Sequence, residues 1–441
     1  MKPETTAKQP KMLQRIMLRL ALGLLAVAVL LFSWTQFKKY ITSGADTGHT
    51  ITIGWIAALR QTGSGEQAVA IKPDGAVLDS PGYPDGARDR DVTWRPDGDR
   101  IYFSSDRDAQ SKSLQIYRWN PAGQGTVDQR SSGKLAQERP SFQQNNPPPG
   151  DYTMLMIKAG VVVEFNPNDG SAHQRVPVES STPTKAGEEG QGMGTQFGSN
   201  YEHLGTSFRE AHWCKNRKYV VGIMHADEGE TLVVICVEPG STPGAIDDGQ
   251  PHGIIKGDHI DMAVDPASGN IAYAVNGFQF INPNEVKPEM IVNGKLHKPF
   301  RNFLGLLNPD DLTASGPIAI WRIGDSPATQ PDVAFAEPQV SPDGTQVAFV
   351  LGSDTKDGFT SKAIVIAPFA VGGGSAGKPI FGGNVGSPTW SPDGKQLAFI
   401  VINPDHHGDI DVMDMSSFTS KVLTLGKGDF SSPRFSPMTH P

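Results

Sequence analysis

Three stretches of the sequence repeat one pattern: VTWRPDGDRIYF (92–103), PQVSPDGTQVAFV (338–350) and SPTWSPDGKQLAFI (387–400). In each stretch a short apolar run leads into Pro-Asp-Gly, and a second run alternates apolar and polar residues. Proline presets φ for the first turn position, aspartate bonds to the backbone that follows, and glycine supplies a left-handed conformation. The flanking runs are rich in Val, Ile, Phe and Tyr, as β-strands are. The pattern therefore predicts a β-hairpin that recurs along the chain.

Weaker copies of this hairpin occupy the intervals between the three clear ones. They are RPSFQQNNPPPGDYTMLMI (139–157), EAHWCKNRKYVVGIM (210–224), DMAVDPASGNIAYAV (261–275) and SPRFSPM (432–438). We call the residue that precedes each turn the anchor of its repeat. The seven anchors are Trp94, Phe142, Trp213, Val264, Val340, Trp390 and Phe435. Since most are large and apolar and occur once per repeat, we expect them to pack between repeats.

The repeats are long enough for four strands each. A third apolar strand follows the hairpins, as in LQIYRW (114–119) and DIDVMDM (409–415), and a fainter fourth precedes the next copy. Four antiparallel strands per repeat make a propeller blade. The segments ITIGWIAAL (51–59) and EQAVAIKPDG (66–75) have no first strand before them, and SPRFSPM supplies one. Pairing the two ends of the chain removes open sheet edges, which predicts an all-β, seven-bladed β-propeller, with six or eight blades as alternatives.

The repeats resemble those of the TolB-like β-propeller family, which carry W-S-P-D-G-K-x-I-A-F and then an I-Y-V-M-D strand. The matching residues are Trp94, Pro96, Asp97, Gly98, Pro342, Asp343, Gly344, Trp390, Pro392, Asp393 and Gly394. The repeat around Trp213 departs from this motif, because it lacks Pro-Asp-Gly. The resemblance covers roughly residues 50–441 and implies a role in protein–protein contacts of the cell envelope.

The N-terminal region has the features of a membrane anchor. Eighteen uncharged residues lie between Arg19 and Lys38, roughly 27 Å as a helix and close to the thickness of a bilayer core. Positive charge is concentrated before the run, which places the N-terminus in the cytoplasm. We therefore expect a cytoplasmic tail (1–17), a transmembrane signal-anchor helix (18–37), a linker (38–49) and an extracytoplasmic propeller (50–441). A cleaved signal peptide is the alternative.

Charge limits the partners of the propeller. The first 40 residues carry seven Lys or Arg and one Glu, so within a net charge of −8 the remainder carries −14. An acidic body without basic stripes argues against nucleic acid as a partner. Two groups of acidic residues and histidines stand out, one around His406-His407 and one formed by His252, Asp258, His259 and Asp261. Both are expected in loops, and we expect neither a metal nor a cofactor.

The two cysteines are expected to be free thiols. Cys214 ends the first strand of its repeat and Cys236 lies on the third. One strand between them separates their Cα atoms by roughly 9–10 Å, whereas a disulfide needs less than about 7 Å. A disulfide between them would contradict this strand assignment.

The motifs indicate a binding module more than an enzyme. We expect a protein-binding or scaffolding role in the cell envelope, with insertions 176–207 and 283–316 as contact surfaces. The apolar cluster Phe300, Phe303, Leu304, Leu306 and Leu307 is the candidate partner contact. The alternative is a propeller hydrolase or lyase with a polar site at the central channel. Three or more His, Asp or Glu side chains at the channel mouth would favour that alternative.

Overall fold

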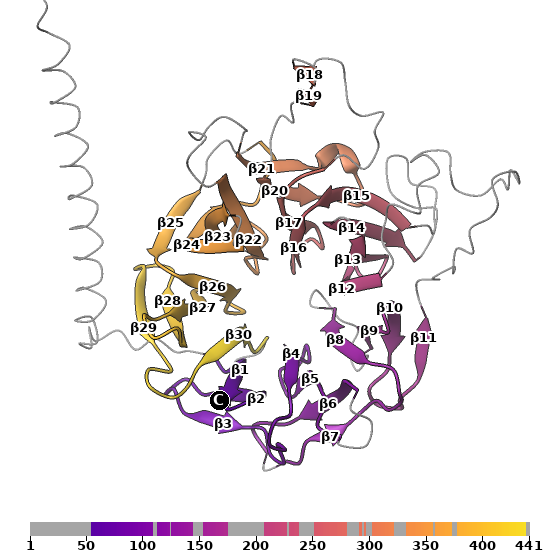
Figure 1. Ribbon diagram of the computed structural model, residues 1–441, viewed down its shortest axis with the longest axis vertical. Coiled ribbons are helices and arrows are strands. Elements are labelled where there is room, and N and C mark those ends of the chain that lie inside the picture. Colours follow the sequence, from indigo (N-terminus) through magenta and orange to yellow (C-terminus); the bar gives the residue numbers. More distant parts are fainter. Residues whose placement is uncertain are drawn as a thin grey trace, which may run out of the picture. The chain divides into compact units, whose positions relative to one another are not determined.

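Seven four-stranded antiparallel sheets form a ring, and we call the region around its axis the central channel (Figure 1). The computed structural model describes residues 54–108, 113–123, 125–143, 153–174, 207–226, 229–237, 251–279, 291–292, 295–296, 302–321, 332–355, 358–372 and 377–437. Within these ranges the regular structure is β-strand, apart from one 3₁₀ turn at Leu312–Ala314. The predicted seven-bladed propeller is confirmed. No helix in the described part is long and apolar enough to span a membrane, and the predicted span 18–37 lies outside that part.

The blades follow one another in chain order, and each runs from the channel outward. Blade 1 contains β1 (Ile56–Thr62), β2 (Gly65–Ile71) and β3 (Val77–Asp79), together with β30 (Phe430–Phe435). Blade 2 contains β4 (Asp89–Trp94), β5 (Ile101–Ser105), β6 (Gln115–Trp119) and β7 (Asp128–Gln129). Blade 3 contains β8 (Gln137–Phe142), β9 (Met154–Lys158), β10 (Val161–Phe165) and β11 (Ala172–Gln174). Blade 4 contains β12 (Ser207–Cys214), β13 (Tyr219–Ala226), β14 (Gly229–Cys236) and β15 (Pro251–Gly257).

The remaining three blades complete the ring. Blade 5 contains β16 (His259–Val264), β17 (Ile271–Asn276), β20 (Asn302–Leu307) and β21 (Gly316–Trp321). A short ribbon of β18 (Ile291–Val292) and β19 (Lys295–Leu296) is inserted between β17 and β20. Blade 6 contains β22 (Asp332–Val340), β23 (Gln346–Thr355), β24 (Gly358–Pro368) and β25 (Lys378–Gly382). Blade 7 contains β26 (Val385–Trp390), β27 (Gln396–Ile402), β28 (Gly408–Asp414) and β29 (Thr419–Val422).

The ring closes through blade 1, which both ends of the propeller share. Strand β30 is the innermost strand of this blade and pairs antiparallel with β1, with Ile56 opposite Phe435 and Arg60 opposite Phe430 (Figure 1). The predicted closure is confirmed. It leaves no unpaired inner strand at the junction, and an exposed strand edge is what natural sheets avoid.

The hydrophobic core lies in layers between adjacent blades. One cluster packs Ile101 and Trp94 of blade 2 against Ala57 of blade 1, and another packs Phe399 of blade 7 against Ile364 of blade 6. The anchors contribute to these layers. Six of the seven are buried: Trp94, Phe142, Trp213, Val340, Trp390 and Phe435. Their regular position at the end of each inner strand explains why one apolar residue per repeat serves this role.

Blade 5 corrects one expectation about partner contacts. Phe303, Leu304, Leu306 and Leu307 form most of β20, the third strand of this blade, and all four are at most 7% exposed. They are core residues and offer no surface to a partner. Phe300 lies outside the described residues, as does most of the insertion 176–207.

The two cysteines lie where the repeat placed them. Cys214 and Cys236 are both paired with Tyr219, from opposite sides, so one strand separates them. They form no disulfide, as expected, and both are buried.

Five of the seven inner strands carry a β-bulge at the same position. The residue three before the anchor has a positive φ between 49° and 54° in these strands: Asp91, Arg139, Glu337, Ser387 and Ser432. The strand register shifts there in each case. Four of the five residues precede a proline, which cannot donate to the ladder and is tolerated at bulges. A bulge bends the strand and re-aims a side chain. The side chain at this position therefore points in a different direction from that in a regular strand.

Candidate functional site at the central channel

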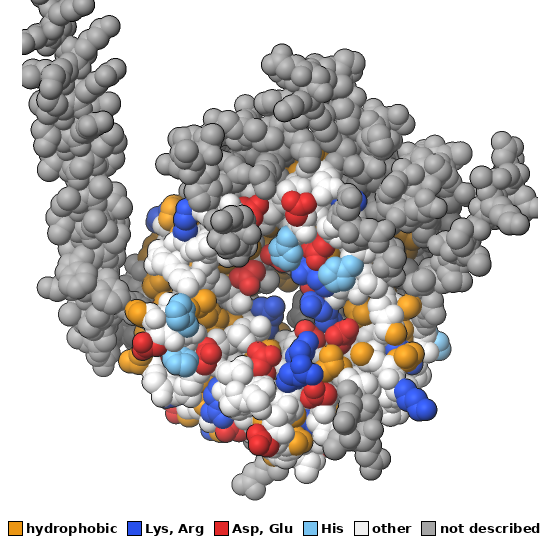
Figure 2. Space-filling model, in the orientation of Figure 1, with side chains coloured by type: hydrophobic (Ala, Val, Ile, Leu, Met, Phe, Trp, Pro, Cys, Tyr) orange, Lys and Arg blue, Asp and Glu red, His pale blue; other side chains and the backbone are white. Residues whose placement is uncertain are grey.

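The channel wall carries one position of each repeat, three residues before the anchor. We call these seven residues the bulge ring: Asp91, Arg139, Glu210, Asp261, Glu337, Ser387 and Ser432. Five of the seven are charged, although they come from segments that are far apart in the sequence. Figure 2 shows acidic, basic and histidine side chains gathered around the centre of this face.

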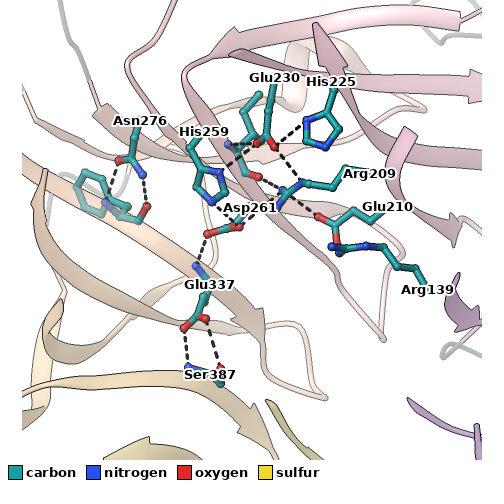
Figure 3. A network of polar contacts seen from close by, with 12 residues as sticks. Arg139, Arg209, Glu210, His225, Glu230, His259, Asp261, Asn276, Glu337 and Ser387 are labelled. Carbon is teal, nitrogen blue, oxygen red and sulfur yellow. Dashed lines mark hydrogen bonds and ion pairs between the residues drawn. The ribbon is translucent and has the colours of Figure 1, made fainter. Parts of the chain in front are cut away.

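Carboxylates of the bulge ring join neighbouring blades. The backbone N–H of Arg139 donates to Asp91 Oδ2 at 3.3 Å. The backbone N–H of Glu337 donates to Asp261 Oδ2 at 3.0 Å, and that of Ser387 to Glu337 Oε2 at 2.5 Å (Figure 3). In each pair the acceptor lies one blade before the donor. The bulge explains this contact, because it turns one N–H out of the strand ladder and leaves it in need of an acceptor.

Blades 4 and 5 contribute a denser ionic network (Figure 3). His259 lies between two carboxylates, with Nδ1 3.2 Å from Glu230 Oε2 and Nε2 3.1 Å from Asp261 Oδ1. Its hydrogen bonds to Asp261 and Glu230 raise the pKa of His259 to about 10. The imidazole is therefore charged at neutral pH and cannot serve as a base. Its role is to neutralise the two carboxylates.

Arg209 connects the parts of this network. Its guanidinium lies 3.1 Å from Glu230, 3.3 Å from Glu210 and 3.8 Å from Asp261. It also donates to the carbonyl of Ile260. Burial alone would raise the pKa of Glu210, but His212 and the neighbouring arginines outweigh burial and lower it. Glu210 therefore stays ionised beside the channel.

A serine and a histidine from adjacent blades meet beside Glu210. Ser141 of β8 and His212 of β12 each lie one residue before their anchors, and Ser141 Oγ is 2.7 Å from His212 Nδ1. On the other side of the imidazole, Nε2 lies 3.7 Å from Glu210 Oε2. Arg139 Nη1 is 3.9 Å from the same carboxylate oxygen. The four groups are thus arranged in one continuous polar cluster.

Arg434 of blade 1 occupies the repeat position of Ser141 and His212, one residue before the anchor. Burial lowers the pKa of Arg434, while the charges of Glu337, Glu210 and Asp91 act in the opposite direction. Within the described ranges no carboxylate comes within 4.0 Å of its guanidinium, which donates only to the carbonyl of Pro433. Arg434 therefore keeps hydrogen-bond donors that the described protein groups do not use.

The Pro, Asp and Gly residues of the repeat motif lie in the turns that follow the inner strands. Gly98, Gly344 and Gly394 have φ values of 71°, 70° and 68°. Asp343 and Asp393 each accept a backbone N–H two residues on. These motif residues shape hairpins and do not approach the channel network.

Most of the channel residues could not be predicted from the sequence. His259 and Asp261 are expected together in a loop, whereas they lie on the inner strand β16. His252 is on β15 of another blade. Among the described residues no group of three or more His, Cys, Asp or Glu is arranged to hold a metal. The sequence does carry one signal for these positions. In four repeats the bulge-ring residue is followed directly by a proline, and the anchor comes two residues after that proline.

No family model and no curated protein matches this chain. Several solved structures are similar. An oligogalacturonate lyase in complex with manganese has 13% sequence identity and a TM-score of 0.49, over 84% of this chain and 85% of that one. An oligogalacturonate lyase from Vibrio parahaemolyticus has 12% identity and a TM-score of 0.44, over the same shares. TolB from Acinetobacter baumannii has 10% identity and a TM-score of 0.36, over 88% of this chain and 84% of that one. The architecture assigned to this chain rests on its own strand order.

Proposed function

We propose that this protein is a membrane-tethered, extracytoplasmic propeller that binds a small anionic ligand in its central channel. The observation that carries this proposal is an imbalance between donors and acceptors in the channel. The carboxylates Asp91, Glu210, Asp261 and Glu337 all accept hydrogen bonds or ion pairs from the protein. The arginines Arg139 and Arg434 retain unused donors.

A ligand that completes this site must bring acceptors and negative charge. A planar guanidinium binds a carboxylate or phosphate through two parallel hydrogen bonds. Such contacts are stronger in a partly buried channel than at an open surface, because screening by water and salt is weaker there. A neutral ligand could accept hydrogen bonds from Arg434 but would not supply a charge opposite to that of its guanidinium.

Titration calorimetry with succinate and with inorganic phosphate tests this proposal. We expect at least one of the two anions to bind, and Arg434→Gln to weaken its binding by at least 10-fold. Lys421→Gln, an exposed cation on the outermost strand β29, is the matched control and should bind as the unaltered protein does. Equal affinities for the two variants would contradict the proposal. Fractionation of membranes, with protease digestion from either side, tests the tether and its orientation.

A second candidate is the protein-binding or scaffolding role. A groove of about 750 Å³ between the turns of blades 6 and 7 favours it. Trp390, Met415 and Phe418 line this groove, and Phe418 is 41% exposed. A photo-crosslinking residue at position 418 would capture a partner if the groove is a contact surface. The same residue at Leu425, which is 71% exposed, is the control, and equal capture at both positions would count against a specific surface.

A further inference from the structure

We propose that Ser141, His212 and Glu210 form a hydrolytic site for carboxylic esters whose acyl group carries a negative charge. This inference rests on the proposed anion-binding channel and assigns its chemistry. The three side chains come from two adjacent inner strands, β8 and β12. They were not singled out as a motif, because Ser141 and His212 are 71 residues apart in the sequence.

The geometry contains the elements of an activated serine. The nucleophile needs a base within hydrogen-bond reach, and the base needs a third group that orients it. Ser141 Oγ lies 2.7 Å from His212 Nδ1. Glu210 Oε2 lies 3.7 Å from Nε2, on the opposite side of the ring. Catalytic contacts of this kind are often long before substrate binds.

The contact between Ser141 and His212 meets the needs of the reaction in one tautomer of the imidazole. If Ser141 donates its proton to Nδ1, the neutral imidazole carries its own proton on Nε2, facing Glu210. When Nδ1 then accepts the serine proton, the ionised Glu210 stabilises the resulting imidazolium. The pKa of Glu210 is lowered, against the effect of its burial, by His212 and the adjacent arginines, so the carboxylate is available in its charged form. Glu210 is the positioning residue.

This pair is specific to blades 3 and 4. The equivalent residues of the other blades are Thr93, Ala263, Gln339, Thr389 and Arg434. In the part of the chain that the structure describes, no other two neighbours at this position share a side-chain hydrogen bond. The Ser141–His212 contact is therefore not a general device for joining blades. Blades are joined instead through the bulge ring and the apolar layers.

The cations of the channel select the substrate. Arg434, on the inner strand β30, has unused donors, and its charge interacts with that of Glu210. We place the anionic acyl group at this guanidinium and the ester carbonyl at Ser141, which is 7% exposed. A monoester of a dicarboxylic acid has both features, because its second carboxyl group is free and ionised at neutral pH.

The reaction balances with water as the only co-reactant. Ser141 Oγ attacks the ester carbonyl carbon and transfers its proton to His212 Nδ1. The bond between the carbonyl carbon and the alcohol oxygen breaks, and His212 returns the proton to the departing alcohol. Water then attacks the acyl-serine and gives a proton to His212. The acid is released, and the proton returns to Ser141 Oγ.

Hydrolysis of mono-4-nitrophenyl succinate by the purified full chain tests this inference. We expect kcat/KM to fall at least 100-fold in Ser141→Ala and in His212→Gln, and kcat to fall in Glu210→Gln. Arg434→Gln should raise KM for this ester without affecting neutral 4-nitrophenyl butyrate. A fluorophosphonate probe should label Ser141, as located by peptide mass spectrometry. Ser416→Ala, which alters a serine in an exposed outer turn, should keep both activity and labelling.

Two outcomes separate this inference from the proposed function. Succinate binding to the unaltered protein and to Ser141→Ala, without hydrolysis or labelling, overturns the hydrolytic site and leaves the anion-binding channel intact. Absence of succinate and phosphate binding removes the proposed function, and hydrolysis that then persists at Ser141 would have to proceed without anion selection. A purely structural contact predicts a lower melting temperature for Ser141→Ala and no labelling of Ser141.

Discussion

The carboxylate of Asp261 accepts the backbone N–H of Glu337 at 3.0 Å, and this bond joins blade 5 to blade 6 at the channel wall. The bulge in β22 exposes that N–H, and Asp261 occupies the same repeat position one blade earlier. The other oxygen of Asp261 faces His259 at 3.1 Å. One side chain therefore takes part both in the contact between blades 5 and 6 and in the ionic network of the channel.

Asp261→Ala should destabilise the propeller by roughly 3 kcal/mol, because it leaves the N–H of Glu337 without its acceptor and leaves the charged His259 with one carboxylate instead of two. Asp261→Asn retains an oxygen for the N–H of Glu337 and should cost less. Urea unfolding followed by tryptophan fluorescence measures both. Equal losses for the two variants would show that the charge of Asp261, and not its hydrogen bond, joins the blades.

The anchor tryptophans give a matched series. The indole of Trp94 donates to the carbonyl of Arg434 at 2.9 Å, and that of Trp390 to the carbonyl of Gln339 at 3.0 Å, each in the preceding blade. The buried indole nitrogen of Trp213 has no acceptor among the described residues. We expect Trp→Phe at positions 94 and 390 to cost about 1 kcal/mol more than at position 213. Chemical unfolding of the three variants measures the difference, and equal costs would show that only packing matters.

Local patterns explain which parts of the fold could be predicted. Pro-Asp-Gly turns and alternating strands are short-range signals, so the hairpins and the shared blade 1 followed from the sequence. Blade 5 was harder, because an insertion separates β17 from β20 and the residues of β20 form a continuous apolar run without alternation. Such a run does not reveal from its pattern whether it lies in the core or on a surface.

The channel site could not be predicted for a different reason. Ser141 meets His212, and Asp261 meets Glu337, only because the closed ring brings equivalent positions of adjacent blades together. No spacing within one repeat encodes such a contact. The recurring proline after the bulge residue marked the position, but not the direction in which its side chain points.

His259 should make stability depend on pH. Its pKa is raised from 6.5 to about 10 by Asp261 and Glu230. The folded state therefore binds a proton that the unfolded state loses near pH 6.5, so the stabilisation is complete below pH 6.5 and disappears as the pH rises through about 10. We expect the stability difference between the unaltered protein and His259→Gln to be largest at pH 6 and to shrink by pH 10. Unfolding at pH 6, 8 and 10 measures it, with His406→Gln, in an exposed turn, as the control.

Asp411 should lower the stability of the folded protein as the pH rises, whereas a carboxylate with partners in the folded state raises it. It is fully buried on β28, neither carboxylate oxygen has a hydrogen-bond partner within the described ranges, and burial raises its pKa from 3.8 to about 7. Folding therefore favours the protonated form. The cost of burying the charge is absent below pH 3.8, grows between pH 3.8 and pH 7, and is complete above pH 7.

Asp411→Asn removes this charge and should stabilise the protein at pH 8 by about 1–3 kcal/mol, the usual cost of a buried group without a partner. Near pH 4 the variant and the unaltered protein should differ little. Asp414→Asn on the same strand is the matched control, because Asp414 accepts the N–H groups of Ser416 and Ser417 and its pKa is lowered by these contacts. That variant should lose stability above pH 4 instead. A destabilised Asp411→Asn at pH 8 would show that the carboxylate of Asp411 has a partner in the folded protein.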